Sequence, residues 1–300
     1  MGVQIPLSAF LFQKIYKSIQ YDYFMKKLIF LLTLFLLGCT VTEELYDIDL
    51  TIKPYPITPN TDTDIGFKIT KDGNLIPLEI NHERIVHVLT VREDLEEFKH
   101  IHPENFGKAT EENIKNSEFG IKNTFAEAAK YLIVFEFQSG GKVLSKQVEL
   151  EVGSKKKEFK VNRDLNMFKS FGDYSIEMIP LESVDEYLMN NVLIQKQSPV
   201  KSKERTGFVF RVVKDGNFVG DLEPYLGSKA HFSVWKEDLT NFMHLHAYES
   251  GHEDNMHGVE KFGPNLPLVV NFPEAGYYKI FVETQHNGKT VVGNFMVEVN

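Results

Sequence analysis

The sequence predicts an all-β protein, in which two tandem immunoglobulin-like β-sandwich domains follow an N-terminal signal segment. Aromatic and β-branched residues favour strands, and the 300 residues include 24 Phe and 12 Tyr. Runs such as YLIVFEF and NFMVEV are short and are bounded by turn signals such as KDGN and HNGK, where Gly and Asn accept a positive φ. The length exceeds that of a usual single domain, and the second half of the chain repeats the first.

Residues 25–38 form the first element, which we predict to be a lipoprotein signal peptide. Lys26 and Lys27 precede an apolar run over residues 28–37, which is too short to cross a bilayer comfortably. The run ends in Leu-Leu-Gly-Cys, which resembles the bacterial lipobox and so implies cleavage before Cys39 and diacylation of its thiol. Lipid chains would hold the protein at a membrane surface. A buried helix or a plain transmembrane anchor is the alternative.

Residues 1–24 have no clear role ahead of a complete signal peptide, and we interpret them as a non-native extension before a translation start at Met25. The single Cys, at position 39, leaves no intramolecular disulfide. The net charge of −9 argues against nucleic acid as a partner, because binding to phosphates needs basic residues. We expect a location in the cell envelope, on the periplasmic or extracytoplasmic face of a membrane.

Five blocks of sequence recur in the same order, with an offset that drifts only from 143 to 147 residues. Three of them are KDGNLIP and KDGNFVG, VREDLEEF and WKEDLTNF, and EAAKYLIVFEFQSGGK and EAGYYKIFVETQHNGK. The repeat divides the chain into a first sandwich domain at 45–152 and a second at 173–300. Residues 153–172 carry a Lys run and lack the strand pattern, which predicts a linker.

Three histidines recur at fixed spacing in each copy: one on a predicted strand, then a His-x-His pair after a polar turn. Side chains at i and i+2 share a face of a strand, and facing Cβ atoms of paired strands lie about 5 Å apart. Three imidazoles should therefore converge, and neutral imidazole is a common ligand of copper and zinc. The predicted metal ligands are His87, His100 and His102 in the first domain, and His231, His244 and His246 in the second.

A Gly-containing loop downstream of the second trio carries three further donors, His252, Met256 and His257. A thioether is a soft ligand that selects copper, so this loop favours copper over zinc as the cofactor. The first copy lacks these residues, and we expect the second-domain site to be the functional one. The competing interpretation is that the histidines are packing or hydrogen-bonding residues that a duplication has copied.

No motif in the sequence indicates catalysis. A Gly-rich phosphate loop, a GxSxG elbow and an HExxH pair are all absent. A blue-copper site needs a Cys thiolate, and the one Cys is assigned to lipid. We therefore expect the protein not to be an enzyme.

Two motifs carry a resemblance to a known family. HVLTVREDLEEFKHIHP at 87 and HFSVWKEDLTNFMHLHA at 231 are the first, and FPEAGYYKIFVETQHNG at 272 is the second. With them the chain resembles bacterial exported, His-rich immunoglobulin-like proteins of the YtkA-like type, which are associated with copper and heavy-metal efflux systems. The resemblance covers most of both domains and implies metal handling in the envelope, by association alone. FAEAAKYLIVFEFQSGG at 125 has lost the Pro and the first Gly, which implies a mainly structural first copy.

The expected function is therefore that of a lipid-anchored envelope protein that binds a transition metal, in metal buffering, delivery or sensing. Its expected partners are the membrane, through the N-terminal lipid, and metal-efflux or other envelope proteins. The alternative is a structural or adhesive immunoglobulin-like module that binds a protein or a surface component without metal.

Overall fold

The computed structural model describes residues 46–81, 83–154, 157–249, 252–253 and 261–300. They belong to a compact unit that runs from Tyr46 to Asn300. The predicted N-terminal extension, the signal peptide and the lipidation site Cys39 lie outside the described residues. Within the described part, no helix is long and apolar enough to cross a membrane.

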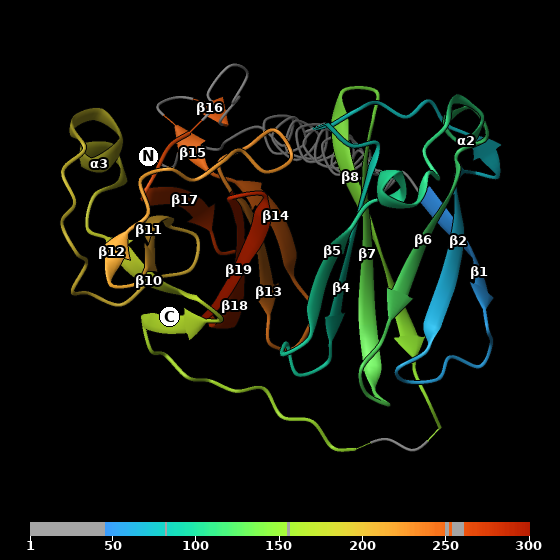
Figure 1. The fold of residues 1–300 in the computed structure, drawn as a ribbon, viewed down its shortest axis with the longest axis horizontal. Helices are drawn as coiled ribbons and strands as arrows, with labels where there is room; N and C mark the ends of the chain where they lie inside the picture. Colours follow the sequence, from blue (N-terminus) through green and yellow to red (C-terminus); the bar gives the residue numbers. More distant parts are fainter. Residues whose placement is uncertain (1–45, 82, 155–156, 250–251, 254–260) are drawn as a thin grey trace, which may run out of the picture. The chain divides into compact units, whose positions relative to one another are not determined.

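The first sandwich packs two four-stranded antiparallel sheets against each other (Figure 1). Its strands are β1 (Tyr46–Lys53), β2 (Asp62–Lys71), β3 (Asn74–Leu75), β4 (Val86–Arg92), β5 (Phe98–Ile101), β6 (Glu118–Thr124), β7 (Lys130–Ser139) and β8 (Lys142–Glu151), with the short helices η1 (Pro103–Phe106) and α2 (Glu111–Asn116) between β5 and β6. One sheet has the order β1-β2-β3, with β6 on β2, and the other has the order β5-β4-β7-β8. Strand β2 alternates as a half-buried strand should, and it turns Ile65, Phe67 and Ile69 into the core.

The second sandwich repeats this plan with a five-stranded and a four-stranded sheet. Its elements are β9 (Phe168–Phe171), β10 (Tyr174–Leu181), α3 (Val184–Asn190), β11 (Arg205–Lys214), β12 (Asn217–Phe218), β13 (His231–Lys236), β14 (Phe242–His246), β15 (Tyr248–Glu249), β16 (His252–Glu253), β17 (Asn265–Asn271), β18 (Gly276–His286) and β19 (Lys289–Val299). The four-stranded sheet has the order β14-β13-β18-β19, which matches β5-β4-β7-β8 strand for strand. The prediction of two tandem β-sandwiches is thus confirmed.

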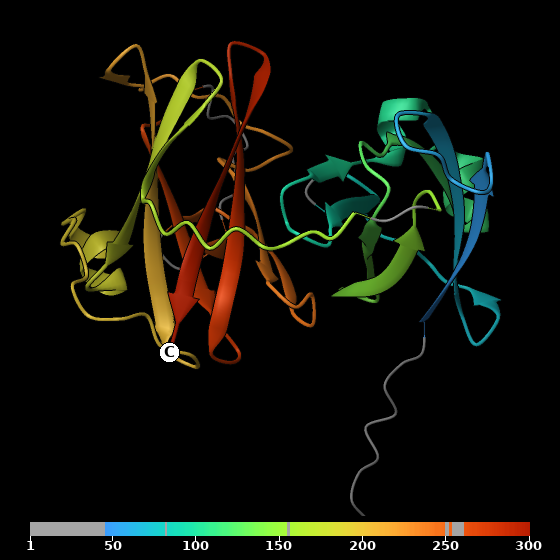
Figure 2. The ribbon, with the colours of Figure 1, turned by 90° about the horizontal axis from the view of Figure 1, so that it is seen from below.

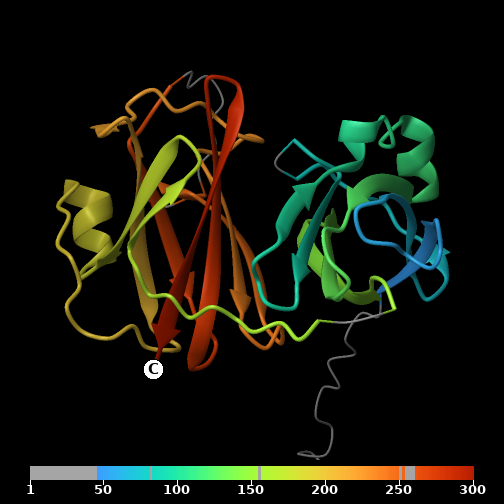
Figure 3. The same ribbon diagram turned by 60° about the horizontal axis from the view of Figure 1, so that its bottom comes forward.

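Two further features belong to the second half of the chain: helix α3 and the extended segment that leads into β9. Helix α3 lies beside the five-stranded sheet (Figure 3), where Tyr187 packs with Leu181 and Val209. The segment after β8 is extended and contains no helix or strand over residues 157–166 (Figure 2). Strand β9 begins at Phe168, inside the stretch that the Lys run had predicted to be linker, because Phe168–Phe171 completes a hairpin with β10.

A shared apolar cluster contains residues from both sandwiches. The rings of Phe98 and Phe281 stack with their centroids 4.3 Å apart, and Lys279 forms an ion pair with Glu96 at 2.8 Å beside them. The sheets β5-β4-β7-β8 and β14-β13-β18-β19 supply every buried member except Leu95, which lies in the turn between β4 and β5. The two sheets that carry the histidines are therefore also the two that meet. These members are Leu89, Val91, Leu95, Leu132, Val134, Trp235 and Phe281.

Truncation of the shared apolar cluster should destabilise the whole compact unit. Phe281 is 2% exposed, and we expect Phe281→Ala to lower the free energy of unfolding by about 3 kcal/mol, from lost burial and the cavity left behind. Denaturant titration followed by Trp235 fluorescence would measure this. Phe218→Ala is the matched control, because Phe218 is 56% exposed and its loss should cost less than about 0.5 kcal/mol. Equal losses in the two variants would contradict the assignment.

Candidate metal centre

Two hairpins, β4-β5 and β13-β14, bring the histidines of each copy onto one face. In the second copy His231 of β13 pairs with His246 of β14. His244 lies two residues before His246 on β14, so all three rings project from one side of the sheet. In the first copy Leu89 pairs with His100, which sets the β4-β5 register in the same way. We call His87, His100 and His102 the first triad, and His231, His244 and His246 the second triad.

The first triad directs three ring nitrogens at one point. His87 Nδ1 lies 3.0 Å from His100 Nε2. His102 Nε2 lies 3.1 Å from each of those two nitrogens. Three nitrogens of one ligand type at nearly equal separations form a trigonal donor set of the kind that holds zinc or copper.

The outer contacts of the first triad fix where its protons lie. His87 Nε2 donates to the backbone carbonyl of Asn81 at 3.1 Å, so its inward Nδ1 carries a lone pair. His100 Nδ1 lies 2.8 Å from a Glu283 carboxylate oxygen, and with that carboxylate ionised its inward Nε2 also carries a lone pair. Two lone pairs then face each other at 3.0 Å, an arrangement that a proton or a metal ion between them would stabilise.

His231 and His244 of the second triad repeat the contacts of His87 and His100. His231 Nε2 donates to the carbonyl of Tyr225 at 3.0 Å, and its Nδ1 lies 3.2 Å from His244 Nε2. His244 Nδ1 lies 2.6 Å from a carboxylate oxygen of Glu136. The ring centroid of His246 lies 4.6 Å from that of His231 and 5.0 Å from that of His244.

The two triads form one histidine cluster of six rings rather than two separate sites. The ring centroids of His87 and His244 are 5.1 Å apart, and those of His100 and His244 are 5.0 Å apart. Ligand atoms of His100, His231 and His244 lie within 4.8 Å of one another, although these residues come from different sandwiches. The side chains of His100 and His244 are 0% and 1% exposed, so the cluster is excluded from water.

Burial controls the protonation of the first triad and of Glu283. It lowers the pKa of His87 and His100 well below their usual range, and the neighbouring imidazoles of both triads add to the shift. Burial lowers the pKa of His102 to about 3 and raises the pKa of Glu283 to about 8. The first-triad rings are therefore neutral at pH 7, with lone pairs available to a metal, whereas the metal-free pair of Glu283 and His100 retains a proton that a bound cation would displace.

The structure brings together all six histidines that the repeat pointed to, but it does not describe the downstream loop fully. His252 lies on the short strand β16, and its side chain is not described. Met256 and His257 lie outside the described residues. The expectation of one separate site in each domain differs from the arrangement found, because the two hairpin sheets face each other and merge the triads.

Sequence reasoning missed the two glutamates of the cluster, Glu136 and Glu283. A signal for them was present, because each is the single acidic residue inside a mostly apolar strand of a repeated block, YLIVFEF and YKIFVET. Strand pairing sets Glu136 beside His87 and Glu283 beside His231. Each glutamate then contacts the triad of the other sandwich, which no single-domain pattern could have indicated.

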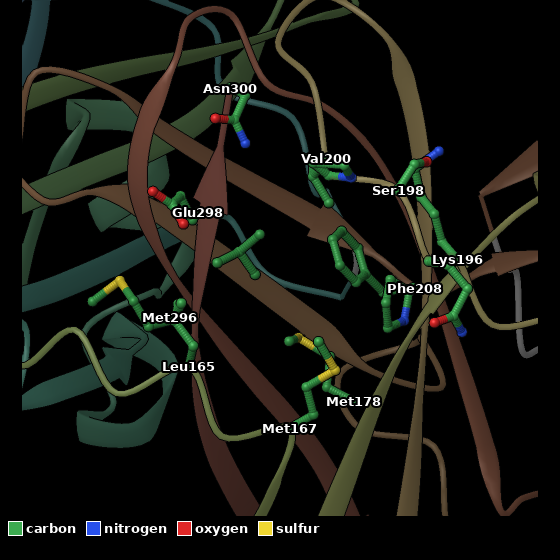
Figure 4. Close-up of a pocket in the computed structure, with 14 residues that line it drawn as sticks. Leu165, Met167, Met178, Lys196, Ser198, Val200, Phe208, Met296, Glu298 and Asn300 are labelled. Atoms are coloured by element: carbon green, nitrogen blue, oxygen red, sulfur yellow. The ribbon is translucent and has the colours of Figure 1, made fainter.

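A pocket of about 310 Å³ in the second sandwich is a separate feature (Figure 4). Met167 and Met178 lie side by side in it, next to Phe208. No histidine is among its lining residues. The pocket is therefore not part of the histidine cluster.

The metal-free protein should lose stability on acidification. His87, His100 and His102 have lowered pKa values in the folded state, so each takes up a proton on unfolding below about pH 6.5, the ordinary pKa of histidine. Glu283, whose pKa is raised, releases one proton and offsets only one of the three. Near pH 5.5 unfolding should thus bind about two protons, and stability should fall as the pH drops from 6.5. Urea titrations at stepwise pH would measure this slope, and a flat profile between pH 7 and 5 would contradict it.

Comparison with known families gives a match over both sandwiches. The family described as "Domain of unknown function (DUF8832)" matches residues 40–154 and 183–300, and the two segments correspond to the two copies of the repeat. No curated protein matches the sequence.

The chain also matches solved structures, among them a titin fragment, invasin and a nectin-like molecule. A titin fragment (A168169) is 12% identical over 85% of this chain and 98% of that one, with a TM-score of 0.21. Invasin, a bacterial integrin-binding protein, is 9% identical over 84% and 39%, with a TM-score of 0.21. The ectodomain of mouse nectin-like molecule 4 is 9% identical over 85% and 64%, with a TM-score of 0.20. At these TM-scores none of the resemblances bears on function.

The family match covers most of the chain, extends over both sandwiches and follows the internal repeat. The protein therefore belongs to the DUF8832 family.

Proposed function

We propose that this protein is a lipid-anchored cell-envelope protein that binds a transition metal, copper ahead of zinc, through its buried histidine cluster. The observation that carries the proposal is the convergence of His87 Nδ1, His100 Nε2 and His102 Nε2 to within 3.1 Å of one another. Its role would be metal buffering, delivery or sensing rather than turnover.

A metal explains this convergence better than packing does. A ring N–H can serve as the donor between two imidazoles, but a third nitrogen at the same distance then faces a lone pair or a proton already in use. Burying polar nitrogens without full hydrogen bonding costs roughly 1–3 kcal/mol for each group. A cation near the centre of the triangle accepts all three lone pairs at once, and metal–nitrogen bonds of about 2.0 Å need only a small outward movement of the rings.

Copper is the first candidate because of the donor set. Imidazole nitrogen suits copper as well as zinc, and copper stands above zinc in the order of affinity of first-row metals for a given site. Second contacts from Glu283 and the Asn81 carbonyl orient His100 and His87, as outer partners of metal-bound imidazoles do. The His-x-His and repeat motifs, which resemble those of proteins associated with copper efflux, support the same choice.

Buffering or delivery agrees with the burial of the cluster. His87 and His102 are 1% and 2% exposed, so an ion held by them has no open position for a substrate, which a catalytic metal requires. The lipobox-like sequence ending at Cys39 supports attachment to a membrane, where an efflux system or another envelope protein would be the partner.

Metal content tests the proposal directly. Residues 40–300, which include the whole compact unit, should retain copper after micromolar loading and desalting, as measured by elemental mass spectrometry. The double variant His100→Ala/His102→Ala should lose at least half of it. His286→Ala is the control, since His286 contacts Tyr174 and Asp221 outside the cluster and should retain the wild-type amount. A wild-type chain that retains neither copper nor zinc would leave the metal-free binding module as the better account.

Metal should also stabilise the folded chain by mass action. A metal at about 100 times its dissociation constant should raise the free energy of unfolding by about 2.7 kcal/mol. Thermal unfolding with metal and then with excess chelator would show a rise in Tm that reverses. The His286→Ala control should show the same rise, and the His100→Ala/His102→Ala variant a smaller one. An identical rise in all three proteins would indicate binding outside the cluster.

A further inference from the structure

Two of the three histidines in each triad make equivalent contacts in the two copies. In each copy the first histidine, His87 or His231, donates from Nε2 to a backbone carbonyl six residues earlier. Its inward Nδ1 therefore carries a lone pair, which faces Nε2 of His100 at 3.0 Å or of His244 at 3.2 Å. The second triad therefore has two donors that match those of the first, and His246 adds a third ring, whose centroid lies 4.6 Å from that of His231 and 5.0 Å from that of His244.

One ring nitrogen cannot serve both positions. His100 belongs to the first triad and also lies within ligand distance of His231 and His244. An imidazole whose Nδ1 is engaged by a carboxylate has a single lone pair, on Nε2, and can bind one ion at a time. With His100 used in the first triad, His231 and His244 must take their third ligand from their own copy, and His246 is the ring closest in sequence and register.

The carboxylates cross between the sandwiches. Glu283 of the second sandwich contacts His100 of the first at 2.8 Å, and Glu136 of the first contacts His244 of the second at 2.6 Å. Carboxylates that bind the outer nitrogen of a metal-bound imidazole fix its tautomer and raise its basicity. Each sandwich thus supplies the residue that orients the central ligand of the other.

Charge balance indicates which ions fit. The glutamate side chains are 8% and 7% exposed, and buried charge is stable only when it is compensated nearby. Two monovalent cations neutralise two carboxylates, whereas two divalent cations would leave a buried excess of positive charge. Among the metals that imidazole suits, copper is the one with a monovalent ion, Cu(I).

We propose that the histidine cluster binds two Cu(I) ions, one in each triad, and that Glu283 and Glu136 are positioning residues, each acting on the ion of the other sandwich. This rests on the proposed function, since it presupposes a metal-binding cluster. It adds the number of ions, their oxidation state and the dependence of each site on both domains.

Stoichiometry is the first test. Residues 40–300 are loaded with Cu(I) under ascorbate without oxygen, desalted, and assayed for copper per chain. We expect two ions in the wild type, one in His102→Ala, one in His246→Ala and two in the His286→Ala control. One ion in the wild type would overturn the two-ion centre while leaving the proposed function intact, and none would overturn both. If an alanine variant does not fold, His102→Asn or His246→Asn takes its place.

The cross-domain role of the carboxylates has its own test. In the His246→Ala background only the first triad is complete, and Glu283→Gln should weaken Cu(I) binding about tenfold, as measured by competition with a colorimetric Cu(I) chelator. Glu136→Gln should have little effect there. In the His102→Ala background the two effects should exchange. A general loss of stability would not produce this exchange, and a glutamine change that weakens only the ion of its own sandwich would overturn the assignment.

Discussion

The reciprocal contacts between histidine and carboxylate are the constraint on which the rest of the structure depends. Six imidazoles and two carboxylates lie between two sheets, where water does not reach them. Buried polar groups of this kind are stable only with partners, and His100 and His244 find theirs in the opposite sandwich, at Glu283 and Glu136. The six-ring cluster, with its crossed carboxylate contacts, therefore forms only while both domains are docked.

The apolar and polar parts of this contact have different roles. The shared apolar cluster around Trp235 and Phe281 supplies a driving force that is not directional. The histidine–glutamate pairs add specificity, because hydrogen bonds between buried groups tolerate only a narrow range of distance and angle. Burial also lowers the pKa of each first-triad imidazole, which keeps these rings neutral and suited to bind a metal.

The contact between the two sandwiches has the two-fold symmetry of a homodimer, although both halves belong to one chain. In a two-fold interface residue i contacts residue j of the partner, and j contacts i in return; the pairs His100–Glu283 and Glu136–His244 follow that rule. The symmetry is incomplete at its edges. Leu132 of β7 corresponds in the repeat to Lys279 of β18, which reaches Glu96 instead of packing as an aliphatic residue. A duplicated chain can change one copy in this way, which an identical dimer cannot.

The sequence by itself determined the local structure. Strand periodicity, turn residues and the repeat were enough to predict two β-sandwiches, the two hairpins and the convergence of three imidazoles on one face of each, because these features depend on residues close together in the chain. The tertiary structure alone decided that the two faces meet, that six rings form one cluster, and that Glu136 and Glu283 cross between domains. Those contacts join residues more than 100 positions apart, and the packing of whole sheets, rather than any local pattern, brings them together.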